Sequence, residues 1–134
     1  MHLLRLAALL SIVGLVSCAT DSPHRRAQSF GEHGPYCADI EAAFRIDFST
    51  DRAARLKRIA SVVDLSSHEQ VFLIEAALVG GFSSDQADVL SALASNPGLT
   101  GEARSYLGSN IERIDFSTER QRVVDAMIEN DAGR

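Results

Sequence analysis

The chain has 134 residues, with 13 basic against 18 acidic residues and a formal net charge of −5. A chain of this length is enough for one domain. Its acidic balance excludes a typical nucleic-acid binder, because contacts to phosphate require a positive surface.

An apolar run occupies positions 6–16, after a short positive segment. The run is shorter than the roughly 20 residues of a membrane span, and its layout is that of a secretory signal. It ends in Leu15-Val16-Ser17-Cys18, which resembles the lipobox of bacterial lipoproteins. The resemblance implies a signal peptide over residues 1–17, cleavage after Ser17 and lipid attachment at Cys18. A signal peptide cleaved at another small residue is the alternative.

Ala19, and not an aspartate, follows the cysteine. In enterobacterial-type lipoproteins an aspartate at that place retains the protein in the inner membrane. The resemblance therefore implies a location in the bacterial cell envelope, lipid-anchored at the outer membrane and facing the periplasm.

The residues from Cys18 to Gly34 are polar, contain Pro23 and show no apolar period. This composition predicts a flexible tether between the lipid and the domain. The only other cysteine is Cys37. We predict that Cys37 is a small buried hydrophobe, with a bridge to a second chain as the alternative.

A repeat with a period of about 17 residues fills most of the remaining segment, 35–134, and a fixed period indicates a repeat architecture. Each unit opens with Phe or Leu, continues with Ser or Thr, and in most units has an acid in the next few positions. Such a hydroxyl followed by a negative charge is a helix start signal. With one helix over 35–44 before the first unit, the sequence predicts an all-α fold of about six helices. The opening residues are Phe48, Leu65, Phe82, Leu99 and Phe116.

The alternation of Phe and Leu predicts that two units form one helical hairpin of about 34 residues, and that the hairpins stack in a repeat-like bundle. Odd and even helices then lie in different layers. Apolar residues at the ninth position of each unit predict a core stripe, and the opening residues are expected to be buried too, Phe82 most of all. Capping boxes are predicted at Ser66-x-x-Glu69 and Ser83-x-x-Gln86. The ninth-position residues are Leu56, Leu73, Leu90, Leu107 and Val124.

Two helices differ from the others. The helix over 66–79 is apolar on almost every side, which predicts a central place. The helix over 100–114 contains Gly108 in its interior, which predicts fraying or a kink.

The phrases FSTDRAARL, FSSDQADVL and FSTERQRVV resemble short helical repeats of unknown function in bacterial envelope proteins, over roughly residues 44–130. The resemblance implies the fold, and it implies no substrate, cofactor or catalytic residue. A tetratricopeptide repeat is not indicated, because its W-x-x-L-G-x-x-Y pattern is absent and the chain has no tryptophan.

No catalytic, cofactor or metal motif is present among those sought, which include the G-x-S-x-G, H-E-x-x-H and Walker A patterns, so we do not expect an enzyme. The clearest charge asymmetry is a basic group, for which an acidic partner or anionic headgroups are one hypothesis. Pairing with Asp85, Asp88 or Glu75 is the other. The group comprises Arg52, Arg55, Lys57 and Arg58.

These observations favour a membrane-anchored, non-enzymatic helical-repeat lipoprotein that binds another protein of the cell envelope, since repeat folds present extended surfaces for recognition. The alternative is a carrier that holds a small molecule or lipid between its helices.

Overall fold

The computed structural model describes residues 34–134. The expected signal peptide (1–17), Cys18 and the rest of the tether up to position 33 lie outside the described residues. The part of the chain that is described is all-α, which confirms the predicted fold class. Its elements are α2 (Cys37–Phe44), α3 (Ser49–Ala60), α4 (Ser67–Leu78), α5 (Ser83–Ala94), α6 (Gly101–Asn110), a short 3₁₀ turn η1 (Ile111–Arg113) and α7 (Ser117–Ala132).

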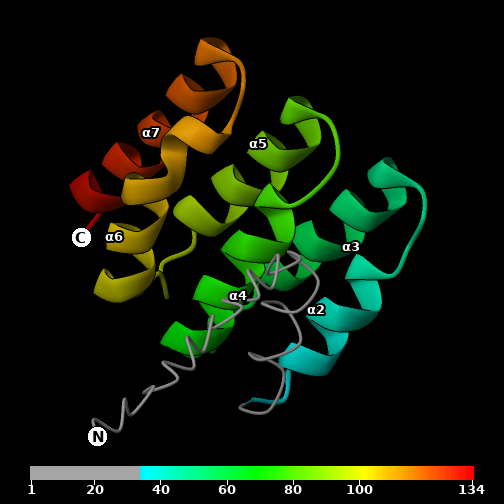
Figure 1. Ribbon diagram of the computed structural model, residues 1–134. Helices are drawn as coiled ribbons and strands as arrows, with labels where there is room; N and C mark the ends of the chain where they lie inside the picture. The colour runs from blue at the N-terminus through cyan, green and yellow to red at the C-terminus, as the bar shows by residue number, and fades with distance from the viewer. Residues whose placement is uncertain (1–33) are drawn as a thin grey trace, which may run out of the picture.

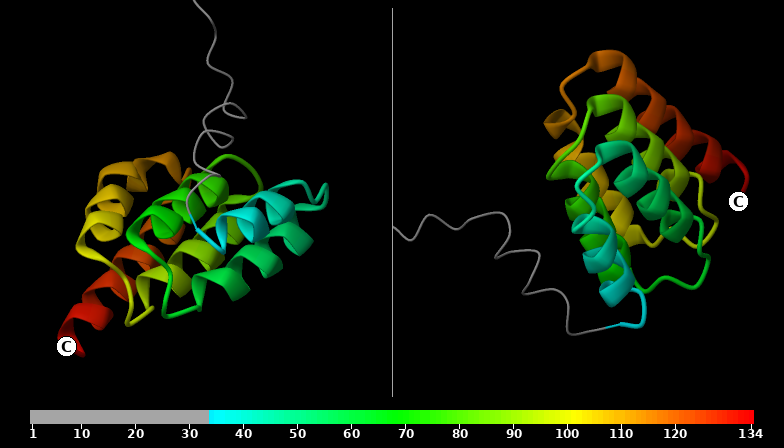
Figure 2. Two further views of the ribbon diagram at one scale, coloured as in Figure 1. Left: turned by 90° about the horizontal axis from the view of Figure 1, so that it is seen from below. Right: turned by 90° about the vertical axis from the view of Figure 1, so that its right-hand side faces the viewer.

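The six helices form two layers. Contacts join α2, α4 and α6 in one layer and α3, α5 and α7 in the other (Figure 1). Figure 2 shows the two layers edge on in its right-hand view. The alternation of Phe and Leu therefore tracks the layer to which each helix belongs. Within residues 34–134, no helix has both the length and the apolar character needed to cross a bilayer.

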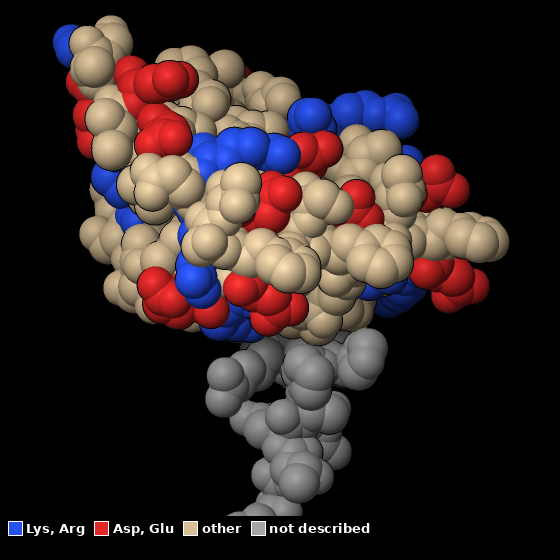
Figure 3. Space-filling model, turned by 90° about the horizontal axis from the view of Figure 1, so that it is seen from above, with Lys and Arg blue, Asp and Glu red and all other residues tan. Residues whose placement is uncertain are grey.

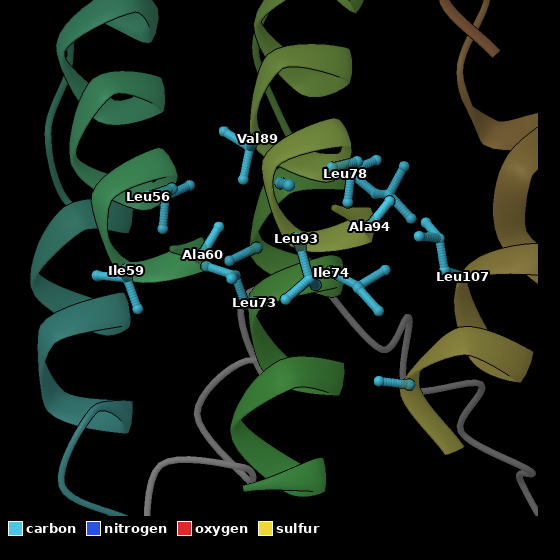
Figure 4. Packing of buried hydrophobic residues seen from close by; sticks show 14 of the residues in the cluster. Leu56, Ile59, Ala60, Leu73, Ile74, Leu78, Val89, Leu93, Ala94 and Leu107 are labelled. Carbon is cyan, nitrogen blue, oxygen red and sulfur yellow. The ribbon is translucent and has the colours of Figure 1, made fainter. Parts of the chain in front are cut away.

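The core lies between the layers, where side chains from both meet (Figure 4). The predicted ninth-position residues Leu56, Leu73, Leu90 and Leu107 are all buried. In the last unit Val123 is fully buried, while the predicted Val124 is only half-buried. The reason is that α7 ends the array and packs chiefly on α5.

Helix α4 is central, as its composition predicted. It contacts α2, α3, α5 and α6, and eight of its 12 residues are buried. Helix α6 remains regular through Gly108, and the helical geometry tightens only after Asn110, where η1 begins. The predicted irregularity in this segment thus lies at the helix end and not at the glycine.

The starts of the five helices that follow α2 differ between the layers. In α4 and α6 the N-cap is Ser66 or Thr100, whose hydroxyl accepts the backbone N–H three residues later. The predicted capping box at Ser66 and Glu69 is confirmed. In α3, α5 and α7 the phenylalanine itself is the N-cap, and no side chain caps these helices.

The second predicted capping box is wrong for the same reason. Because α5 begins at Ser83, this serine is the first helical residue and not the cap. The side chain of Gln86 instead donates from Nε2 to the carbonyl of Leu78 at 3.4 Å, so it joins the end of α4 to the start of α5.

Two asparagines connect successive hairpins. Asn96 is buried and donates from Nδ2 to the carbonyls of Ala60 and Val62, each at 2.8 Å. Asn130 repeats the arrangement one hairpin later, on the carbonyls of Ala94 (2.8 Å) and Asn96 (2.9 Å). Each side chain thus supplies donors to two carbonyls near the end of the preceding helix of its layer, carbonyls that no helical N–H can satisfy.

Candidate functional site

The predicted basic group is distributed around α3. Arg55 points to α2, where its Nη2 lies 3.3 Å from Asp39 Oδ1. Lys57 points to α5, with Nζ 4.0 Å from Asp88 Oδ2. The Arg52 guanidinium lies over the ring of Phe44, with its carbon 5.7 Å from the ring centroid, and Arg58 is exposed.

Three of the four cations therefore face neighbours within the fold. Lys57 pairs with Asp88, one of the three acids proposed for this role, whereas Glu75 binds Arg113 at 2.6 Å. Arg52 and Asp85 line the same small cavity between α3 and α5. Exposed pairs of this kind stabilise a fold by less than about 1 kcal/mol. The basic group is thus largely engaged within the domain and does not form one patch.

The expectation that the opening phenylalanines are buried is wrong. The exposed fraction is 75% for Phe48, 72% for Phe82 and 66% for Phe116. Leu65 and Leu99, which open the even units, are 4% and 2% exposed. The opening position is therefore core in one layer and surface in the other.

The cause is a displacement of the helix start by one residue. In the odd units the first helical hydrogen bond is accepted by the phenylalanine carbonyl, as from Gln86 N to Phe82 O at 3.0 Å. In the even units it is accepted one position later, as from Gln70 N to Ser66 O at 3.0 Å. One residue turns a helical side chain by about 100°, which separates a ring facing solvent from a leucine facing the core.

The three rings form a row that we call the aromatic edge, defined as Phe48, Phe82 and Phe116. Helices α3, α5 and α7 run in the same direction and contact one another in turn, so their N-termini lie together at one end of the molecule (Figure 1). Gly34, where the described chain begins, lies against Glu69 at the N-terminus of α4, at the opposite end. The described chain thus begins at the end away from the aromatic edge.

Carboxylates surround the aromatic edge. Asp47 and Asp115 directly precede two of the rings, and Asp51 follows the first by three residues. All three are exposed, and no ion pair among the described residues engages them. Figure 3 looks down on this end, where acidic and basic side chains both lie among uncharged residues.

A shallow open hollow lies between two of the rings. Its lining includes Phe82 and Phe116 together with the carboxyl-bearing Asp115 and Glu119. The hollow is thus lined by two aromatic rings, two carboxylates and the serines at the start of α5.

Glu69 is the one buried carboxylate of the described core, at 2% exposure. Burial on its own would raise the pKa of Glu69. Hydrogen bonds from Tyr36 N and from the Ser66 hydroxyl and N–H have the larger combined effect, and the pKa lies below its ordinary value. The distances are 2.8 Å, 2.7 Å and 2.8 Å, respectively. These donors come from the backbone before α2 and from the N-cap of α4, so Glu69 fixes the start of α2 on α4.

A small cavity and a buried thiol are the remaining features of the described interior. The cavity shared by Arg52 and Asp85 has a volume of about 10 Å³, which is room for about one water. Cys37 is 0% exposed, as predicted. Among residues 34–134, no three His, Cys, Asp or Glu side chains are grouped so as to hold a metal ion. Cys18, the expected lipidation site, lies outside the described residues.

Among known proteins, no family model, curated protein or solved structure matches the chain.

The aromatic edge was missed in the sequence because a periodic phenylalanine is typical of a core. The signal that was present is the parity itself. Only the odd units open with phenylalanine, and the even units open with leucine. In the structure the odd units are the ones that lack a capping hydroxyl at the N-cap.

Proposed function

We propose that the protein is a lipid-anchored, non-enzymatic helical-repeat module that binds another protein of the bacterial cell envelope through its aromatic edge. The proposed anchor is a lipid on Cys18, attached after removal of residues 1–17, and the proposed location is the outer membrane, facing the periplasm.

The observation that supports binding is a repeated breach of a local rule. Serine at an N-cap is more favourable than an apolar residue by about 1 kcal/mol, and the covered quarter of a largely exposed ring only offsets about that amount by burial. Phenylalanine nevertheless stands at this position in α3, α5 and α7. Local rules are broken mainly at functional sites, and exposed apolar patches mark contact surfaces.

The carrier alternative receives less support. The cavity between α3 and α5 has the volume of about one water and a charged lining, whereas a pocket for a small molecule has about 300–1,000 Å³. The hollow between Phe82 and Phe116 has a volume of about 400 Å³, but it is open and lies at the surface, which suits a protein segment better than an enclosed ligand.

The anchor is tested by mass spectrometry of the protein made in a lipoprotein-processing bacterium. We expect an N-terminal Cys18 carrying acyl mass, and release from the membrane on Cys18→Ser. A mature N-terminus at another residue would refute this part of the proposal.

Binding is tested with a photo-crosslinking amino acid at position 82 of the lipidated protein in envelopes. The matched control is the same amino acid at Ile128, which is 59% exposed and lies outside the aromatic edge. We expect one discrete adduct from position 82 that is absent from position 128 and is lost when Phe48 and Phe116 are replaced by serine. Equal crosslinking at both positions would contradict a role of the aromatic edge.

A further inference from the structure

The spacing of the aromatic edge restricts what can lie across it. Packed helices are about 8–10 Å apart, and the three phenylalanines occupy the same place on three neighbouring helices. A partner that meets all three rings must therefore present apolar side chains in a line, one about every 9 Å.

Among regular backbones, a polyproline II segment repeats its side chains at about this 9 Å spacing with the fewest residues per repeat. It rises about 3.1 Å per residue with three residues per turn, so every third side chain recurs on one face after about 9 Å. Side chains on one face of a strand recur after about 7 Å. An α-helix reaches about 10 Å only at every seventh residue, and its diameter exceeds the width of a single row of rings.

Charge restricts the partner further. Asp47, Asp51 and Asp115 are exposed beside the rings without an ion-pair partner in the described chain. The arginines nearest in sequence are engaged elsewhere, which leaves these carboxylates to an external cation. These arginines are Arg45, which pairs with Glu41 (3.9 Å), Arg52, which lies over the ring of Phe44 (5.7 Å), and Arg113, which pairs with Glu75 (2.6 Å).

We propose that the aromatic edge binds an extended, polyproline-like segment of a partner protein that carries an apolar side chain at every third residue and lysine or arginine between them. The apolar side chains pack beside the three rings, one of them in the hollow between Phe82 and Phe116, and the cations lie over the neighbouring carboxylates. This inference rests on the proposed function and specifies the chemistry of the partner. A rigid polyproline segment binds well on exposed rings because little entropy is lost on docking.

The test uses a fluorescent peptide of four Lys-Pro-Leu triplets and the chain from residue 18 onward, carrying Cys18→Ser to remain unlipidated. We expect saturable binding by fluorescence anisotropy, with amide shifts in the NMR spectrum confined to residues 47–51, 81–85 and 115–119. Replacing Phe82 by serine should weaken binding about tenfold. The control Val63→Ser, at an exposed apolar residue outside the aromatic edge, should leave it unchanged.

Three further arms separate the parts of the inference. A peptide of the same composition with its leucines grouped should bind at least several-fold more weakly, and equal binding would overturn the spacing. A Glu-Pro-Leu peptide should not bind, and the triple variant with Asp47, Asp51 and Asp115 changed to asparagine should weaken the lysine peptide several-fold and flatten its salt dependence. No effect of these changes would overturn the cationic partner.

The remaining outcomes concern the class of partner. Binding of the chain to neutral phosphatidylcholine vesicles that is lost on Phe82→Ser would assign the aromatic edge to a lipid surface and overturn the inference. Failure of every peptide together with retained crosslinking from position 82 would overturn the inference and leave the proposed function standing. Loss of both would refute the two together.

Discussion

Replacement of Phe82 by serine should leave the stability of the protein almost unchanged, although this position is the central member of the most regular series in the chain. The ring is 72% exposed, so little more than a quarter of it is covered. About 200 Å² of a phenylalanine is available for burial, and the covered part therefore contributes about 1.4 kcal/mol at about 25 cal/mol per Å². A serine N-cap returns about 1 kcal/mol.

The expected net change is thus below about 1 kcal/mol, compared with the roughly 3–5 kcal/mol typical of a buried phenylalanine changed to alanine. Phe82→Ala loses the same area and gains no cap, so it should be about 1 kcal/mol less stable than Phe82→Ser. Phe72, at 1% exposure, is the matched buried ring, and Phe72→Ala should show the full loss.

The assay is urea denaturation followed by circular dichroism, with equal m-values required for the comparison. A loss of about 3 kcal/mol or more for Phe82→Ser would show that the ring is core. Equal stability of the serine and alanine variants would show that the cap argument, and with it the reason for regarding the phenylalanine as a breach of local rules, is wrong.

Three other predictions concern buried groups. Asn96→Ala leaves two carbonyls at the C-terminal end of α3 without the donor that this side chain supplies, and should lower the free energy of unfolding by about 2–4 kcal/mol. The half-buried Asn130→Ala should lower it less, and the reverse order in urea denaturation would contradict the packing described. Because the pKa of Glu69 is lower in the folded chain than its ordinary 4.5, its contribution is present above that value and is lost as pH falls through the folded pKa. The free energy of unfolding measured from pH 6 to pH 3 should therefore fall more for the wild type than for Glu69→Gln. Parallel curves would be evidence against a stabilising role of the Glu69 carboxylate. Cys37 should react with a thiol reagent only after denaturant is added, and rapid labelling of the native protein would show that α2 opens.

The layers and the core were predictable because both follow from the period of the sequence. Leucine at the ninth position of four units needs only helical geometry to be placed in a core, and the apolar character of α4 needs only the rule that such a helix is covered on every side. The number of helices followed from the same count.

The aromatic edge was not predictable by that route. The phrases that open at Phe48 and Leu65 have the same local pattern, and the placement of the ring depends on whether the helix starts at the first or the second residue of the phrase. That choice depends on tertiary packing, as Gln86 illustrates: its side chain reaches the Leu78 carbonyl instead of closing a capping box. Boundaries that move by one residue are a known weakness of local patterns, and here one residue decides between core and surface.

The sequence predicted correctly that the basic group lies on one helix, but the structure does not bring its four side chains together. Residues 52, 55, 57 and 58 are close in sequence, yet a turn of about 100° per residue distributes them over α3, and they meet different neighbours. Only the partners on α2 and α5, such as Asp39 and Asp88, determine which charge is satisfied, and these are too distant in sequence for local reasoning.

The asparagine links have a consequence for how this molecule can change in length. Asn96 and Asn130 both reach back 34 and 36 residues. Val62 stands at the equivalent place after α3, which is the first helix of its layer among the described residues. If the segment from Phe82 to Asp115 were deleted, Asn130 would take the place of Asn96 and find the carbonyls of Ala60 and Val62 in register. A tandem duplication of the same segment would likewise place an asparagine over the end of the preceding helix in each copy. The asparagine bonds between hairpins would therefore survive the gain or loss of a whole hairpin, whereas insertion of a single unit, half a hairpin, would exchange the layers.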